Sequence, residues 1–347
     1  MVLRKRLPYA LLIGLIIACG LAPTANADTA TLVLTSAGQN LGFTLNTVVD
    51  GLGITSGCCG PLGNAVAPNG NIVIDFSNAT MNFVFPDANN QTAVNAISST
   101  SFTDFPPAFA TSNGALWGSG GFSGPDAGKL VKLNNDGTIN TVYSIQNLSI
   151  SNGMWTNPVN GHLIAAGGGN LYDIDVSGAS PTFRIIVTGV SIDGVTVSPD
   201  GKTAYVATGG GIQGYDIATG NIVLAFQSVN GSADGMGVIT SSNPAINGHI
   251  VVNTNGGTLV LIDPSSLSQV VIASGGTRGD YASADPNGSL LLTQSDELMR
   301  LSCGQGCSVG GPPPQGVVPE PTSLLLFGSG LAALAEFRRR KLLNLSK

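Results

Sequence analysis

A two-residue turn signal recurs along this 347-residue chain at a nearly constant distance, and this regularity constrains the fold more than any other feature. Each copy is an Asn-Gly or Asp-Gly pair between two apolar runs, the pattern with the strongest tendency to form a β-hairpin. The pairs are Asn69-Gly70, Asn113-Gly114, Asn160-Gly161, Asp200-Gly201, Asn247-Gly248 and Asn287-Gly288. Successive pairs are 44, 47, 40, 47 and 40 residues apart, which leaves room for about four short strands in each unit.

Four-stranded units that repeat with a period in the forties are typical of a β-propeller, in which each unit forms one blade of a ring. The sequence therefore predicts an all-β fold with six blades. The clearest unit runs from 193 to 226 and contains an inner strand, the Asp200-Gly201 turn, two further strands and an outer strand. Composition supports this prediction, because 48 Gly and only 10% charged residues leave few stretches that can form long amphipathic helices.

The last unit of the repeat indicates how the ring closes. It offers three strands, near 281–285, 289–293 and 297–302, and lacks a fourth. Two N-terminal runs, 30–35 and 43–49, can supply that strand, which would join the first and last blades and leave no open edge. Because a six-bladed ring needs only one of these runs, a seventh, degenerate blade is an open alternative.

Five oxygen-bearing side chains each open the innermost strand of a blade, so blade order places them around one mouth of the central channel. They are Asn64, Asn152, Asp193, Asp234 and Asp280. Oxygen ligands of this kind suit a hard cation such as Ca²⁺, which would also relieve repulsion between the carboxylates. The alternative is structural, because Asp and Asn side chains in tight turns often bond to their own backbone.

The unit at 193–226 resembles the repeats of YVTN, NHL and gluconolactonase-like propellers, and the resemblance extends more weakly over residues 58–302. Hydrolases of the gluconolactonase-like type hold a divalent ion with Asp, Asn and Glu side chains, and one Asp serves as the base. The resemblance therefore implies that Asp193 or Asp234 is the catalytic base. The glutamate ligand at the start of the first blade has no match in this sequence, where residues 57–64 contain no acidic side chain.

Several other sequence features do not indicate a functional site in this chain. Residues 209–214 satisfy G-x-G-x-x-G but join two predicted strands, so no helix N-terminus follows to hold a phosphate. The two histidines, His162 and His249, each follow a hairpin turn, and we expect both to face solvent. A net charge of −6 without a basic stripe argues against nucleic acid as a partner.

The N-terminus predicts export. Arg4-Lys5-Arg6 is a positive region, an apolar run follows, and Ala25-Asn26-Ala27 is an A-x-A cleavage site. Residues 1–27 are therefore predicted to be a signal peptide that the Sec machinery and signal peptidase handle. The alternative is a bacterial lipobox at 16–19, in which Cys19 would be lipidated.

The C-terminus carries three features in a fixed order. Val318-Pro319-Glu320-Pro321 precedes an apolar stretch at 322–336, and Arg338-Arg339-Arg340 follows it. The stretch is shorter than the ~20 residues of an ordinary membrane span, and the basic cluster would hold the end of the chain in the cytoplasm. Residues 318–341 resemble the PEP-CTERM sorting signal, which implies a transmembrane helix in the inner membrane and processing by an exosortase. A plain membrane anchor is the alternative.

These signals divide the chain into a signal peptide, a propeller domain at 28–309, a Gly/Pro linker at 310–317 and the sorting segment. The protein would pass through the periplasm as an inner-membrane intermediate and then reach the cell surface or the extracellular space. Its exported part contains four cysteines, Cys58, Cys59, Cys303 and Cys307, an even number that predicts disulfide bonds with three pairings open. A four-cysteine metal site is disfavoured, because the C-x-x-C spacing is missing.

Two classes of function remain. The first is an exported binding or structural module at the cell surface or in the extracellular matrix, linked to exopolysaccharide, biofilm or a surface protein. Propellers present loops on a rigid ring, and function lies in those loops. The second is a lactonase or esterase that depends on a divalent cation. The missing glutamate and the lack of an evident nucleophile favour the first class.

Overall fold

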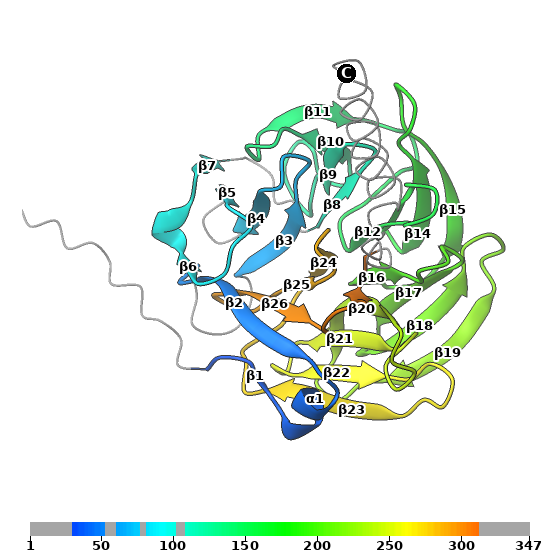
Figure 1. Cartoon of the computed structure of the whole chain (residues 1–347). Coiled ribbons are helices and arrows are strands. Elements are labelled where there is room, and N and C mark those ends of the chain that lie inside the picture. The colour runs from blue at the N-terminus through cyan, green and yellow to red at the C-terminus, as the bar shows by residue number, and fades with distance from the viewer. Residues whose placement is uncertain (1–29, 53–59, 77–80, 102–107, 312–347) are drawn as a thin grey trace, which may run out of the picture.

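The computed structural model describes residues 30–52, 60–76, 81–101 and 108–311. Within these ranges the chain forms six antiparallel sheets arranged as blades around a central channel (Figure 1). This confirms the predicted all-β, six-bladed propeller. The predicted signal peptide, the sorting segment, Cys58 and Cys59 lie outside the described residues. No helix in the described ranges is long and apolar enough to cross a membrane.

The blades follow one another along the chain. Blade one contains β3 (Pro61–Val66), β4 (Ile72–Phe76), β5 (Met81–Phe85) and β7 (Ser98–Ser101). Blade two contains β8 (Phe109–Ser112), β9 (Ala115–Ser119), β10 (Leu130–Leu133) and β11 (Ile139–Tyr143). Blade three contains β12 (Met154–Thr156), β13 (Leu163–Gly167), β14 (Asn170–Asp175) and β15 (Thr182–Thr188). Blade four contains β16 (Val195–Val197), β17 (Thr203–Thr208), β18 (Gly211–Asp216) and β19 (Ile222–Ser228).

Blades five and six take strands from both ends of the domain. Blade five contains β20 (Ala233–Ser241), β21 (Ile250–Thr254), β22 (Leu259–Ile262) and β23 (Gln269–Ser274), with β1 (Val33–Leu34) and β27 (Cys307–Val309) at its two edges. Blade six contains β24 (Ala282–Ala284), β25 (Leu290–Thr293), β26 (Leu298–Ser302) and β2 (Thr44–Asp50), and the short β6 (Gln91–Thr92) lies parallel to β2. The short helices are α1 (Ser36–Asn40) and the 3₁₀ turn η2 (Ala93–Asn95).

The six predicted turns all join the first and second strands of their blades. Their glycines adopt the left-handed conformation that a tight hairpin requires, with φ from 68° at Gly114 to 90° at Gly288. In four of the six turns the Asn or Asp side chain also accepts a hydrogen bond from the backbone two residues on, as Asp200 does from the Lys202 N–H at 3.1 Å. The turn signals therefore identified real hairpins.

An N-terminal strand closes the ring, as predicted. Strand β2 pairs antiparallel with β26, from Thr44 opposite Ser302 to Val49 opposite Leu298, and supplies the missing outer strand of blade six. The other N-terminal run forms β1, which pairs with the outer edge of blade five at Val33 and Ser274. Both runs therefore have a place in a six-bladed ring, and the described residues form no seventh sheet.

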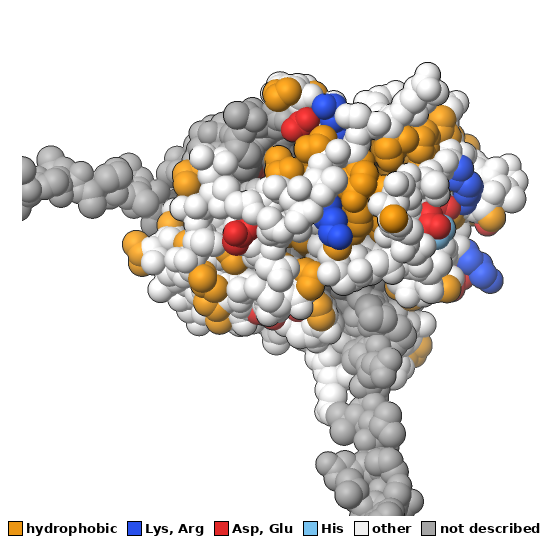
Figure 2. Space-filling view, turned by 90° about the horizontal axis from the view of Figure 1, so that it is seen from above, with side chains coloured by type: hydrophobic (Ala, Val, Ile, Leu, Met, Phe, Trp, Pro, Cys, Tyr) orange, Lys and Arg blue, Asp and Glu red, His pale blue; other side chains and the backbone are white. Residues whose placement is uncertain are grey.

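Apolar side chains fill the seams between neighbouring blades. Val73 and Leu116 lie between blades one and two, and Ile164 and Val206 lie between blades three and four; all four are fully buried. Burying one such side chain contributes about 1.5–3 kcal/mol, so the packed seams hold the blades together. The rim is different: on the side of the ring that Figure 2 shows, the charges are few and scattered among apolar and uncharged polar side chains.

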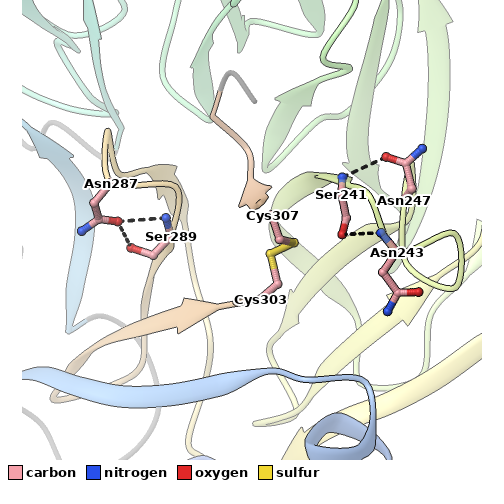
Figure 3. The surroundings of a disulfide bond; sticks show 7 residues. All are labelled: Ser241, Asn243, Asn247, Asn287, Ser289, Cys303 and Cys307. Atoms are coloured by element: carbon pink, nitrogen blue, oxygen red, sulfur yellow. Dashed lines mark hydrogen bonds between the residues drawn. A yellow bond between two sulfur atoms is a disulfide. The ribbon is translucent and has the colours of Figure 1, made fainter. Parts of the chain in front are cut away.

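The chain turns back into the channel after the last blade. Cys303 and Cys307 form a disulfide with Cα atoms 5.6 Å apart, and Figure 3 shows it near the Asn287 and Asn247 turns. Strand β27 then pairs antiparallel with the inner strand of blade five, with Val309 opposite Ile239. This pairing settles one open question, because neither Cys303 nor Cys307 is left to bridge to the N-terminal cysteines.

Candidate functional site

The channel has two unlike ends. The inner strands begin at the end that we call the upper mouth, and the Asn-Gly and Asp-Gly turns, the disulfide and β27 lie at the opposite end, the lower mouth. The predicted ring of Asn and Asp residues belongs to the upper mouth. The inner strands approach one another so closely there that the space between Gly153, Gly194, Gly235 and Tyr281 is about 10 Å³, room for roughly one water molecule.

Glycine makes this close approach possible. A Cβ atom on Gly194 would lie 2.0 Å from the Asp234 carbonyl oxygen of the next blade, and one on Gly153 would lie 2.6 Å from the Asp193 carbonyl oxygen. The Gly153 N–H instead donates a hydrogen bond to that Asp193 carbonyl at 2.7 Å. The glycine in each Asn-Gly or Asp-Gly pair of the upper mouth is therefore required by backbone contact between blades.

Three of the five predicted residues come together with an arginine. The Arg278 guanidinium donates to the Asp280 carboxylate from Nη2 at 2.8 Å and from Nε at 3.1 Å. The same Nη2 lies 3.8 Å from Oδ2 of Asp234, and Tyr281 donates its hydroxyl proton to Asp193 at 3.1 Å. The upper mouth thus combines three carboxyl groups, one phenol and one fixed cation.

Asp234 is the most unusual member of the cluster. Its side chain is fully buried, and neither carboxyl oxygen accepts a hydrogen bond. Burial, followed by the charges of Asp193 and Asp280, raises the pKa of Asp234 well above its ordinary value. Burial also raises the pKa of Asp193, and the hydrogen bond from the Tyr281 hydroxyl opposes this shift.

The two asparagines bond elsewhere. The Asn152 side-chain amide donates to the Ile192 carbonyl at 2.7 Å, and Asn64 accepts a hydrogen bond from the Ser283 hydroxyl at 2.5 Å. Both contacts join neighbouring blades. The contacts of Asn152 and Asp193 therefore differ from the structural alternative, in which each side chain bonds to its own backbone.

The donor set does not fit one coordination sphere built from all five residues. Asp280 is held by Arg278, Asn64 and Asn152 bond to other groups, and the guanidinium repels a divalent ion beside Asp234. Within the described residues, no group of three or more His, Cys, Asp or Glu side chains is arranged to hold a metal ion. The free oxygens belong to Asp234 and Asp193, which are the residues that would hold an ion.

Sequence reasoning missed Arg278, Tyr281 and the residue that positions their loop. Asn253 is fully buried, and its side-chain amide donates to the Asp280 and Thr293 carbonyls at 2.9 Å each. Arg278 stands two residues before Asp280, and this short spacing of opposite charges could have predicted that the two side chains pair. No sequence pattern indicated the role of Asn253, because it lies far from Asp280 in sequence, on the second strand of the previous blade.

The two histidines are less exposed than expected. Nδ1 of His162 lies 2.8 Å from the Asp173 carboxylate, which also accepts from Arg184 at 2.7 Å, and the His162 side chain is 27% exposed. The His249 side chain is 17% exposed, with Nε2 3.8 Å from Asp263. The two histidines are therefore half-buried and not fully solvent-facing as expected, because each lies beside a carboxylate of its own blade: Asp173 on the third strand β14, and Asp263 just after the third strand β22.

The lower mouth contains a cavity of about 300 Å³. Inner strands of blades one, two, three and six form its sides, and Gly310 and Gly311 close it beside β27. Its other lining residues are Ala65, Val66, Phe109, Ala110, Thr111, Met154, Trp155, Thr156, Pro158, Ser283, Ala284, Asp285 and Pro286. Most of these side chains are apolar. This space is larger than the one at the upper mouth and lies away from Asp193, Asp234 and Asp280.

Comparison with known proteins identifies the C-terminal signal. Residues 317–341 match the family model of the PEP-CTERM protein-sorting motif. This confirms the resemblance seen in the sequence and marks the chain for export and for exosortase sorting to the surface or the extracellular space. No curated protein matches the chain in sequence.

Solved structures confirm the propeller fold. A gluconolactonase from Xanthomonas campestris matches with a TM-score of 0.57 at 14% identity, covering 79% of this chain and 96% of that chain. Regucalcin from Agrobacterium tumefaciens, described as a calcium-binding protein, matches with a TM-score of 0.53 at 16% identity, covering 78% and 97%. A luciferin-regenerating enzyme matches with a TM-score of 0.53 at 13% identity, covering 79% and 99%. At these identities the similarity shows the fold alone.

Proposed function

We propose that this protein is an exosortase-processed β-propeller that acts at the cell surface or in the extracellular matrix as a binding module for exopolysaccharide. The sorting motif supports the destination. One structural observation carries the choice of binding over hydrolysis: Arg278 pairs with Asp280 and lies beside Asp234, so a cation of the protein's own already stands among the upper-mouth carboxylates and disfavours a divalent ion there.

The rim supports a glycan as the partner. Its charges are few and scattered (Figure 2), so binding would not depend on long-range attraction between charges. Outer strand β7 exposes Ser99 and Ser101, whose hydroxyl groups donate and accept hydrogen bonds as sugar hydroxyls do. A neutral, hydroxyl-rich edge suits an uncharged or weakly charged polysaccharide.

Cosedimentation tests this function. Mature protein recovered from the surface of the producing cells is mixed with exopolysaccharide from the same cells, and the pelleted fraction is measured at low and high salt. We expect saturable retention that survives high salt, because few charged groups take part. Protein that stays in the supernatant under both conditions would contradict the binding role.

A second candidate is a cation-dependent lactonase or esterase, and one observation favours it. Asp234 is buried, strongly shifted in pKa and paired with Asp193, and such carboxyl pairs can work as acid and base. The pair would also be the place for Ca²⁺, which would supply charge stabilisation to a reacting carbonyl. Hydrolysis of a lactone panel, lost on adding chelator and lost in Asp234→Asn, would establish this function instead.

A further inference from the structure

The lower-mouth cavity is large enough to hold a small ligand. Its volume of about 300 Å³ lies at the lower end of the range for small-molecule sites. Phe109 and Trp155 are among its lining residues, and Met154, Pro158 and Pro286 add further apolar surface. The described structure therefore contains a preformed apolar space inside a rigid ring.

The polar groups of the wall already have partners in the protein. Thr111 donates its hydroxyl proton to the Val66 carbonyl at 2.6 Å, and Thr156 donates to the Thr111 carbonyl at 2.9 Å. Asp285 is paired with Arg300, whose Nη2 lies 3.0 Å from Oδ2. A polar or charged ligand would lose its hydration and gain few new hydrogen bonds here, whereas an apolar ligand would lose nothing of this kind.

The C-terminal segment supplies one side of the cavity. The Gly310 N–H donates to the Val238 carbonyl at 2.7 Å, and the Val309 N–H donates to the Gly288 carbonyl at 2.9 Å. Gly310 lies against Trp155, where a Cβ atom would be 2.5 Å from ring carbon Cζ2. The cavity wall therefore depends on the segment that the Cys303–Cys307 disulfide directs into the channel.

We propose that the lower mouth is a binding site for a small, uncharged apolar molecule, with Trp155 as its principal contact and Gly310 and Gly311 as its closing wall. This site is separate from the proposed polysaccharide-binding role of the rim. Either proposal can therefore fail without the other.

The two tryptophans of the chain make the site measurable. Trp117→Phe leaves Trp155 as the remaining tryptophan, and bromobenzene serves as the probe, because it is apolar, uncharged and quenches indole fluorescence on contact. We expect saturable quenching of Trp155 by bromobenzene and none by glucose.

Ala110→Leu, which adds bulk inside the cavity, should weaken binding at least tenfold, while Ala245→Leu on the exposed surface should leave it unchanged. If Ala110→Leu fails to fold, Ala284→Leu replaces it.

Two results would overturn the proposal. One is quenching that rises linearly with bromobenzene and is equal in the Ala110→Leu and Ala245→Leu proteins, which indicates collisions without a site. The other is saturable quenching that appears only after Pro312, Pro313 and Pro314 are changed to Ser. These prolines follow Gly311 in the sequence, so that result would show that the chain's own segment fills the cavity.

Discussion

Arg278 holds the carboxylate of Asp280 with two nitrogen atoms, Nη2 at 2.8 Å and Nε at 3.1 Å, and presents the same guanidinium to Asp234 at 3.8 Å. This arrangement places a positive charge of the protein's own among the carboxyl groups of the upper mouth. Mutual repulsion between them is therefore relieved in part by Arg278. Asp280 is thus paired within the fold, while neither oxygen of Asp234 accepts a hydrogen bond.

The close approach of the inner strands gives a sharp prediction for Gly194. Replacement by Ala would place a Cβ atom 2.0 Å from the Asp234 carbonyl oxygen, a backbone atom that cannot move alone. We expect Gly194→Ala to lower the free energy of unfolding by about 3 kcal/mol. Gly178→Ala is the matched control, because the nearest atom to its Cβ is 3.6 Å away, and it should stay within about 0.5 kcal/mol of the native protein. Equal denaturation midpoints for both variants would contradict the packing described.

The Cys303–Cys307 disulfide should stabilise the end of the domain. The chain-entropy model gives about 2 kcal/mol for a loop this short, so the double variant Cys303→Ser, Cys307→Ser should unfold at a lower denaturant concentration. Peptide mapping without reduction should recover the two cysteines joined to each other. Recovery of either one joined to Cys58 or Cys59 would disprove the pairing.

Glu297 predicts how stability changes with pH. Burial, then the charges of Asp296 and Asp50, raises the pKa of Glu297 from 4.5 to about 7. The folded protein therefore binds a proton that the unfolded chain releases, so this contribution is complete below pH 4.5 and is lost as the pH rises through 7. Denaturation between pH 5 and pH 8 should show this loss. Glu297→Gln should reduce the slope of the free energy of unfolding against pH over that interval. An unchanged slope would show that other groups cause the pH dependence.

Processing at the sorting motif is the prediction for the C-terminus. In the native host the mature protein should lose the residues after about Pro321, because an exosortase acts near Val318-Pro319-Glu320-Pro321. Intact-mass measurement of surface protein checks this, with a strain lacking the exosortase as control. A native mass that still includes Arg338, Arg339 and Arg340 would show that no processing occurs.

Much of the fold could be predicted because it depends on local chemistry. Asn and Asp before Gly form tight hairpins wherever they occur, and six of them at a blade-length spacing define six blades. Strand β2 was predictable in the same way, since blade six visibly lacked a fourth strand. The paths of β1 and β27 could not be predicted, because their pairing with the edges of blade five depends on contacts between residues more than 65 apart in sequence. Val33 pairs with Ser274, and Ile239 pairs with Val309.

The candidate site was predictable only in part. Blade order correctly placed Asp193, Asp234 and Asp280 near one another at one mouth. Their charge balance was missed, because it depends on the direction in which Arg278 points and on Asn253, which anchors the loop from the neighbouring blade. The repeat pattern also gave no sign of the lower-mouth cavity, which exists because the C-terminal segment returns into the channel.

The central claim is that Arg278 supplies the positive charge that the upper-mouth carboxylates need. Arg278→Gln should lower the free energy of unfolding by about 3 kcal/mol at pH 8, since it leaves a buried charged group without its partner. Arg184→Gln is the control, because Arg184 pairs with Asp173 on a more exposed part of the blade and should cost less than about 1 kcal/mol.

Thermal unfolding of the native protein and of Arg278→Gln, each with chelator and with saturating Ca²⁺, tests that claim most directly. The account predicts that the melting temperature of the native protein is the same in both conditions and that Ca²⁺ partly restores the variant. Stabilisation of the native protein by about 2.7 kcal/mol at a hundred times the dissociation constant of Ca²⁺, abolished by Asp234→Asn, would contradict the account and establish a cation site at the upper mouth.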